Sequence, residues 1–173
     1  MPPRQGPPNY VASDALLSPC GTYRYWLSRR WDDTRAVVAF VMLNPSTADA
    51  EKDDPTIRCC VRLAKREGFG GIHVVNLFAF RTPDRETFPD RVDPIGPDND
   101  RHIREAACLG AVTVVAWGEY VPVSARPRQV FELLREAGVS PKCIERLKGG
   151  QPRHPLYLRQ NARLLDFYEG SGS

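Results

Sequence analysis

Polar side chains that can hold water or a small ligand stand directly after apolar runs of the sequence. Asn44 and Ser46 follow the apolar run over 35–43, and Asn76 follows the next one. An asparagine amide offers both a donor and an acceptor, and a histidine ring such as that of His154 can donate an N–H. Asn44 cannot act as a strong base, but its carbonyl can hold a water molecule. These residues favour water positioning and recognition of polar ligand atoms.

Buried strands and amphipathic helices alternate along the chain and must position these side chains. Apolar and alternating runs predict strands over 22–27, 35–43, 71–80, 111–118 and 143–147. Apolar spacing and helix-end residues predict helices over 54–68, 99–109 and 130–138. This alternation predicts an α/β fold, with a mostly parallel sheet covered by helices on both faces. Ligands of such sheets bind beyond the carboxyl ends of the strands, where the polar residues would face one crevice.

The composition is that of one globular domain. The chain has 173 residues, of which 42% are hydrophobic and 26% are charged. We expect a single domain over 10–169, a disordered tail over 1–9 and a flexible end over 170–173. No apolar run is long enough to cross a bilayer and no leader is present, so we expect a cytoplasmic protein without a membrane partner. We also expect a monomer.

The cysteines and the charges indicate little chemistry by themselves. Five cysteines without C-x-x-C spacing predict neither disulfides nor a metal site, and we interpret them as buried thiols. The segment 126–163 contains nine Lys or Arg and three Asp or Glu. Two interpretations of this excess remain open: a surface that faces a polyanion such as DNA, or a solvated helix face with basic loops.

Four short motifs stand at the expected strand ends and in the last loop. They are MLNPS over 42–46, VVNLF over 74–78, AWGEY over 116–120 and HPLYL over 154–158. In this order they resemble the motifs of the uracil-DNA glycosylase superfamily. The stretch MLNPSTAD, followed by DDPT, is also similar to a group of small bacterial and phage proteins, which indicates a distinct branch. The resemblance implies a three-layer sandwich around a central, mostly parallel four-stranded sheet, with room for an extra N-terminal edge strand.

The resemblance implies a monofunctional DNA glycosylase. Such an enzyme flips a damaged or modified pyrimidine out of DNA and hydrolyses its N-glycosidic bond. The implied catalytic residues are Asn44, Asp54 and His154. The implied base-binding residues are Met42, Ser46, Asn76 and Phe78. The implied DNA-binding residues are Arg81, Arg153, Tyr157, Leu158 and Arg159. Leu158 would be the wedge that fills the gap in the base stack, and neither a metal nor another cofactor is implied.

Three positions depart from the superfamily pattern and bear on the substrate. Met42 replaces the usual Gly, Ser46 replaces Tyr or Gly, and Tyr157 replaces Pro. The small Ser46 leaves room at C5 of the base, so 5-hydroxymethyluracil and uracil are the expected substrates. For Asp54, a helix N-cap is the stronger interpretation. The alternative is that Asp54 or its neighbour Asp53 orients the attacking water.

Two other functions remain open. The same crevice could hold a free nucleoside or nucleotide whose N-glycosidic bond is hydrolysed. A second alternative is a non-catalytic protein that binds DNA at a modified base. No G-x-x-x-x-G-K-S/T motif occurs, so a Walker-type nucleotide hydrolase is not expected.

Overall fold

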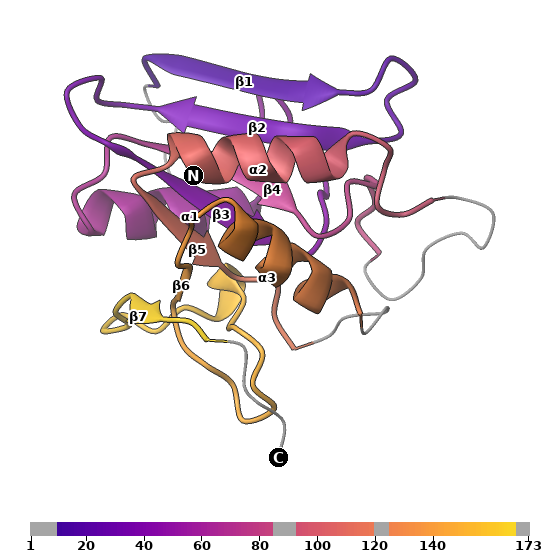
Figure 1. Cartoon of the computed structure of the whole chain (residues 1–173). Helices are drawn as coiled ribbons and strands as arrows, with labels where there is room; N and C mark the ends of the chain where they lie inside the picture. Colours follow the sequence, from indigo (N-terminus) through magenta and orange to yellow (C-terminus); the bar gives the residue numbers. More distant parts are fainter. Residues whose placement is uncertain (1–9, 85–92, 120–124, 169–173) are drawn as a thin grey trace.

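The computed structural model describes residues 10–84, 93–119 and 125–168, and the expected tails lie outside these ranges. Figure 1 shows one sheet with helices packed against it. The strands are β1 (Ala12–Leu17), β2 (Arg24–Arg30), β3 (Val37–Met42), β4 (Gly71–Asn76), β5 (Val112–Val115), β6 (Lys142–Cys143) and β7 (Leu165–Asp166). The helices are α1 (Pro55–Arg66), α2 (Asn99–Leu109), α3 (Arg126–Glu136) and the short 3-10 helix η1 (Pro155–Tyr157). Within the described ranges no helix is long and apolar enough to span a bilayer.

The sheet is parallel in its centre and antiparallel at both edges. Its strand order is β1-β2-β4-β3-β5-β6-β7. The pairs β4–β3, β3–β5 and β5–β6 are parallel, whereas β1–β2, β2–β4 and β6–β7 are antiparallel. The predicted α/β fold with a mostly parallel centre is confirmed. The sheet has seven strands where four were expected, because antiparallel strands extend it at both edges, with β1 as an N-terminal edge strand.

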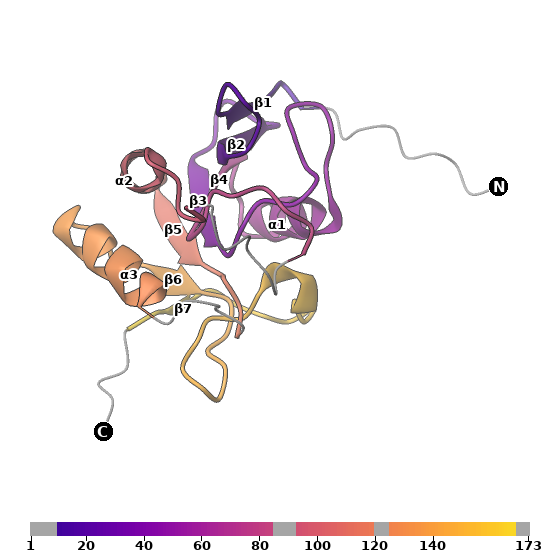
Figure 2. The ribbon, with the colours of Figure 1, turned by 90° about the vertical axis from the view of Figure 1, so that its right-hand side faces the viewer.

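Strand β3 is apolar on both faces because helices cover both. Phe40 and Met42 pack in the cluster that contains α1, and Val41 and Leu43 pack in the cluster that contains α2 and α3. Figure 2 shows α1 on one side of the sheet and the other two α-helices on the opposite side. Each fully buried side chain of this size contributes about 1.5–3 kcal/mol. This double burial fixes the end of β3, from which the chain continues to Asn44.

Asp54 begins helix α1 as its N-cap. Its Oδ1 accepts the N–H of Ile57 at 2.9 Å, and Pro55 occupies the first helical position. A cap of this kind stabilises a helix by about 1 kcal/mol. Gly68, with a φ of 86°, follows the last turn. The N-cap interpretation of Asp54 is therefore confirmed.

A register shift in β2 turns the side chain of Arg24 toward the α1 side of the sheet. Leu16 pairs with Trp26 and Leu17 pairs with Arg24, so that Tyr25 is left without a partner in β1. An extra residue of this kind changes the face to which the following side chains point. The ring of Tyr25 stacks on His102 of α2, with centroids 5.1 Å apart, while Arg24 donates to the carbonyl of Ala48.

Two of the cysteines are exposed, which corrects the expectation that all five are buried thiols. Cys20 lies between β1 and β2, and Cys108 lies near the end of α2, where each reaches the surface. The buried cysteines are Cys59, Cys60 and Cys143. Hydrogen bonds with Ser18 and Thr22 lower the pKa of the Cys20 thiol to about 7. The turn from the edge strand β1 to β2 has too little covering structure to bury the side chain of Cys20.

Candidate active site

A cavity of about 220 Å³ lies at the carboxyl end of β3. Its wall comes from the start of β2, the end of β3 and the loop that follows it, the first turn of α1, the segment after β4 and the loop that contains η1. Asn44, Ser46, Asp54 and His154 all line this cavity. Met42 lines it as well, so the structure brings together five residues that were singled out from the sequence. The volume is below the 300–1,000 Å³ that is common for sites of drug-sized ligands, so a smaller molecule fits it.

The amide of Asn44 is held in one orientation. Its Nδ2 donates to the carbonyl of Pro45 at 3.0 Å and to the carbonyl of Thr82 at 2.9 Å. Both N–H bonds of the amide are therefore used, and the partners are acceptors only, which settles the amide's orientation. The Oδ1 atom accepts no hydrogen bond from the described part of the chain. This carbonyl oxygen is available to a water molecule or ligand in the cavity.

The ring of His154 is fixed in one tautomer. Its Nδ1 accepts the N–H of Leu156 at 3.2 Å, as the residue that precedes helix η1. An acceptor nitrogen carries no proton, so the neutral ring carries its proton on Nε2. The side chain is largely buried and lines the cavity. His154 can therefore act as a hydrogen-bond donor through Nε2.

The Trp117–Gly118 pair supports the loop that carries His154. Trp117 Nε1 donates to Oε1 of Gln151 at 2.7 Å, and the N–H of Gly118 donates to the carbonyl of Pro152 at 2.9 Å. Gly118 has a φ of 84°, and a Cβ there would lie 3.3 Å from Cβ of His154. A larger residue at this position would be strained and would displace the histidine. The AWG motif is therefore a positioning element for His154.

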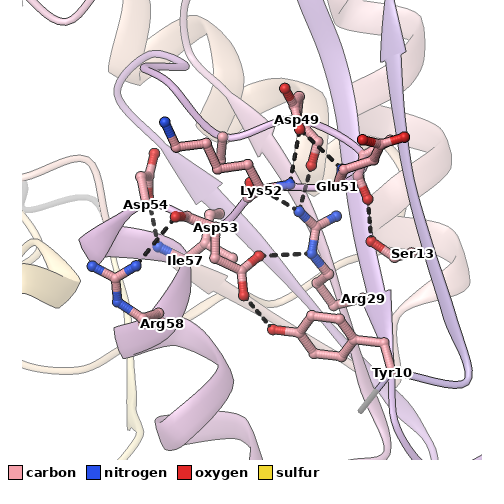
Figure 3. A network of polar contacts seen from close by, with 12 residues as sticks. Tyr10, Ser13, Arg29, Asp49, Glu51, Lys52, Asp53, Asp54, Ile57 and Arg58 are labelled. Atoms are coloured by element: carbon pink, nitrogen blue, oxygen red, sulfur yellow. Dashed lines mark hydrogen bonds and ion pairs between the residues drawn. The ribbon is translucent and has the colours of Figure 1, made fainter. Parts of the chain in front are cut away.

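The two neighbouring aspartates have different environments. Asp53 pairs with Arg29 at 2.8 Å and accepts the hydroxyl of Tyr10 at 2.5 Å, as Figure 3 shows. Burial and the Asp53 carboxylate both raise the pKa of Tyr10. Asp54, in contrast, lines the cavity while its Oδ1 caps α1. Of the two, only Asp54 is placed to act on a ligand.

Two predicted base-binding residues lie outside the cavity wall. Asn76 is the register partner of Met42, which does line the cavity, so the two side chains share one face of the sheet. Asn76 is 1% exposed, and neither its Oδ1 nor its Nδ2 has a hydrogen-bond partner among the described residues. Phe78 is buried in the cluster with α2 and α3, on the other face. Asn76 therefore lies near the cavity, whereas Phe78 lies on the opposite face of the sheet.

The side chain of Arg81 supports the loop after β3. Its Nε donates to the carbonyl of Ser46 at 3.1 Å, and its Nη2 donates to the carbonyl of Thr47 at 3.3 Å. These bonds fix the backbone on which the Ser46 hydroxyl stands. Arg81 is predicted to bind DNA, and in the structure its Nε and Nη2 donate to carbonyls of the protein itself.

The residues around η1 differ in exposure: Arg153 and Leu158 are half-buried, whereas Tyr157 and Arg159 are exposed. Leu158, the predicted wedge, packs against the hydrophobic cluster that contains α1. Tyr157 is 60% exposed and lines a second cavity of about 410 Å³, which shares His154 with the first. Arg153 forms an ion pair with Glu145 at 2.7 Å, and the exposed Arg159 approaches the same carboxylate at 3.9 Å. Tyr157 is thus the apolar side chain most accessible to a partner at this edge.

Arg24 lines the cavity and was not identified from the sequence. It is 2% exposed, and its Nη1 donates to the carbonyl of Ala48 at 2.9 Å. Its Nε has no hydrogen-bond partner, and no carboxylate of the described ranges lies within 4.0 Å. Burial lowers the pKa of this guanidinium to about 10. The sequence signal was the single charged residue in the predicted strand TYRYWL, and only the register shift shows where its side chain points.

A family model described as "Protein of unknown function (DUF1643)" matches residues 24–156. The chain belongs to the DUF1643 family. No curated protein and no solved structure shows a significant match to it. In this DUF1643 chain the matched segment runs from Arg24 to Leu156 and contains every residue that lines the first cavity. Among the described side chains, no three His, Cys, Asp or Glu residues are grouped so that they could hold a metal ion.

Proposed function

We propose that this DUF1643 protein is a monofunctional DNA glycosylase of a distinct uracil-DNA glycosylase-like branch. One observation carries the proposal: Asn44 and His154, which are far apart in the sequence, line the same small cavity with their hydrogen-bonding groups already fixed. An oriented carbonyl and an oriented N–H are the two groups that N-glycoside hydrolysis needs. The size of the cavity supports one extruded base as its occupant.

Hydrolysis places positive charge on the sugar and negative charge on the departing base. Asn44 Oδ1 holds the water whose oxygen bonds to C1′, while the bond from C1′ to the base nitrogen breaks and its electron pair leaves with the base. His154 Nε2–H donates to a carbonyl oxygen of the base as charge grows there, which is worth on the order of 3 kcal/mol in a dry site. The water's proton passes to Asp54, whose Oδ2 accepts no hydrogen bond from the described chain.

The base must leave the DNA stack to reach this cavity. Extrusion costs a few kcal/mol, which a side chain inserted into the gap can offset. The exposed ring of Tyr157 beside His154 supports Tyr157 in that role, whereas the packing of Leu158 supports a role in stability. Tyr157→Ala is then expected to reduce activity on duplex DNA more than on single strands. Leu158→Ala is expected to lower the melting temperature with an unchanged duplex preference.

Release of abasic sites tests the proposal. Purified protein is incubated with oligonucleotides that contain 5-hydroxymethyluracil, uracil or thymine, and strands are then cleaved with alkali. We expect cleavage at 5-hydroxymethyluracil, whose hydroxyl can pair with that of Ser46, and at uracil. Thymine, whose methyl group cannot form that hydrogen bond, serves as the comparison for 5-hydroxymethyluracil. Asn44→Ala and His154→Ala should each lose about a hundredfold or more in activity, and the exposed control Asn161→Ala should not change. Absence of abasic sites with excess enzyme, or full activity of Asn44→Ala, would overturn the proposal.

Hydrolysis of a free nucleoside or nucleotide is the second candidate, and one observation favours it. Arg153 and Arg159, which flank η1 in the sequence, both approach the carboxylate of Glu145. Other cations of the segment 126–163 are also paired, since Arg126, Arg135 and Lys142 each contact a carboxylate. Release of free base from deoxyuridine or its monophosphate, without cleavage of the oligonucleotides, would select this function.

A further inference from the structure

Three buried arginines of this protein differ in their counter-charges. Arg29 pairs with Asp53 at 2.8 Å, and Arg126 pairs with Asp100 at 2.6 Å. Arg24, which is equally buried, has no carboxylate within ion-pair distance in the described ranges. It is also the one of the three that lines the first cavity. The protein supplies ion-pair partners to Arg29 and Arg126, whereas Arg24 faces a cavity and has Asp54 as a more distant counter-charge.

The donors of Arg24 are only partly used. Of its five N–H bonds, one donates to the carbonyl of Ala48, and the Nε–H has no partner in the part of the chain that the structure describes. A planar guanidinium binds a carboxylate through two parallel hydrogen bonds. Because the group is desolvated, a negative partner at this place would be bound strongly.

The other charges of the cavity limit the kind of anion. Asp54 lines the same wall and is the carboxylate with the largest effect on the charge of Arg24. Its repulsion disfavours a dianion such as phosphate more than a singly charged carboxylate. Ser46, which also lines the cavity, can donate its hydroxyl to the same group. Together, Arg24, Asp54 and Ser46 favour a carboxylate, which is planar, carries one negative charge and accepts hydrogen bonds through two oxygens.

We infer that Arg24 is the binding site for a carboxylate group on the small molecule or base that occupies this cavity. The identification of the ligand as a base rests on the proposed glycosylase function. Under that function, the preferred substrate is a pyrimidine with a carboxylate at C5. Because the positive charge of Arg24 neutralises the carboxylate, the carboxyl group withdraws electron density from the ring. The base then leaves more readily than one with a hydroxymethyl group.

Direct binding tests this site without turnover. Isothermal titration and thermal shift at pH 7 compare 5-carboxyuracil, 5-hydroxymethyluracil, uracil and inorganic phosphate as probes of the full chain. We expect 5-carboxyuracil to bind at least about tenfold more tightly than the two uncharged bases, since a hydrogen-bonded charge contributes more than a neutral contact. Arg24→Met should lose this preference. Arg35→Met, which removes the same charge at an exposed position, should keep it.

Each outcome has a defined meaning. Equal affinity for charged and uncharged bases in the wild-type protein overturns the inference without any variant, and so does tighter binding of phosphate than of 5-carboxyuracil. Retention of the preference in Arg24→Met also overturns it. Carboxylate binding that depends on Arg24, together with no release of abasic sites from any oligonucleotide, supports the site and rejects the glycosylase function.

Discussion

Two arginines of strand β2 are buried to the same degree and have opposite surroundings. Arg29 is enclosed by Asp53 and by the carbonyls of Asp49 and Lys52, with the ring of Tyr10 beneath its guanidinium (Figure 3). Arg24 has one carbonyl partner and a cavity. A buried charge stabilises a fold only when its partners are complete. The difference indicates that Arg29 holds the loop over 49–53 to the sheet, whereas Arg24 is the arginine for which we propose a ligand.

The largest effect is expected from Arg29→Met. Removing this guanidinium leaves the Asp53 carboxylate buried without its counter-ion and the carbonyls of Asp49 and Lys52 without their donor. We expect the free energy of unfolding to fall by about 3–5 kcal/mol. Urea denaturation measures this change. A loss no larger than that of the exposed control Arg35→Met would show that the network contributes nothing.

Arg24→Met should change stability in the opposite direction. Here the substitution removes a desolvated charge that has no carboxylate within ion-pair distance in the described ranges, and methionine fills a similar volume. The only hydrogen bond lost among the described residues is the one to the carbonyl of Ala48. We expect the free energy of unfolding to rise by about 1–4 kcal/mol. The same urea series measures both variants. If Arg24→Met lowered the free energy of unfolding as much as Arg29→Met, Arg24 would be a structural arginine, and the two residues would not differ in role.

Arg24→Lys separates charge from geometry. Lysine keeps the positive charge but cannot form two parallel hydrogen bonds with one carboxylate. We expect the affinity for 5-carboxyuracil to fall about tenfold, or about 1.4 kcal/mol, with little change in the affinity for uracil. Titration calorimetry on both ligands gives the ratio. Unchanged affinity for 5-carboxyuracil would show that the guanidinium fork is not used.

Asp54→Asn is expected to give the smallest change in stability. Asparagine is as good an N-cap as aspartate, so helix α1 keeps its bond to Ile57, and the free energy of unfolding should change by less than about 1 kcal/mol. Removal of the negative charge should tighten binding of 5-carboxyuracil while it slows base release. Weaker carboxylate binding in this variant would contradict the proposed repulsion.

Elements with strong local signals could be predicted from the sequence. The helix over Pro55–Arg66 has apolar residues at helical spacing, a capping aspartate and a terminal glycine, and it begins where the cap predicts. The apolar run before Asn44 is β3, because a strand covered on both faces has no polar alternation. In contrast, β1 is mostly exposed, and β6 and β7 have two residues each, so their apolar patterns are too weak to define their bounds.

The sequence by itself determined that Asn44 closely follows a central strand and that Asp54 caps a helix, because both follow from neighbours within a few residues. It also indicated that His154 stands in a loop near the strand ends. Only the tertiary structure decided that Phe78 turns to the opposite face, that Arg81 binds its own loop and that Arg24 reaches the cavity. The side to which a side chain points depends on the register between strands, and the acceptor that an arginine binds depends on which carbonyls and carboxylates the fold brings near it. Neither can be read from the spacing of residues along the sequence.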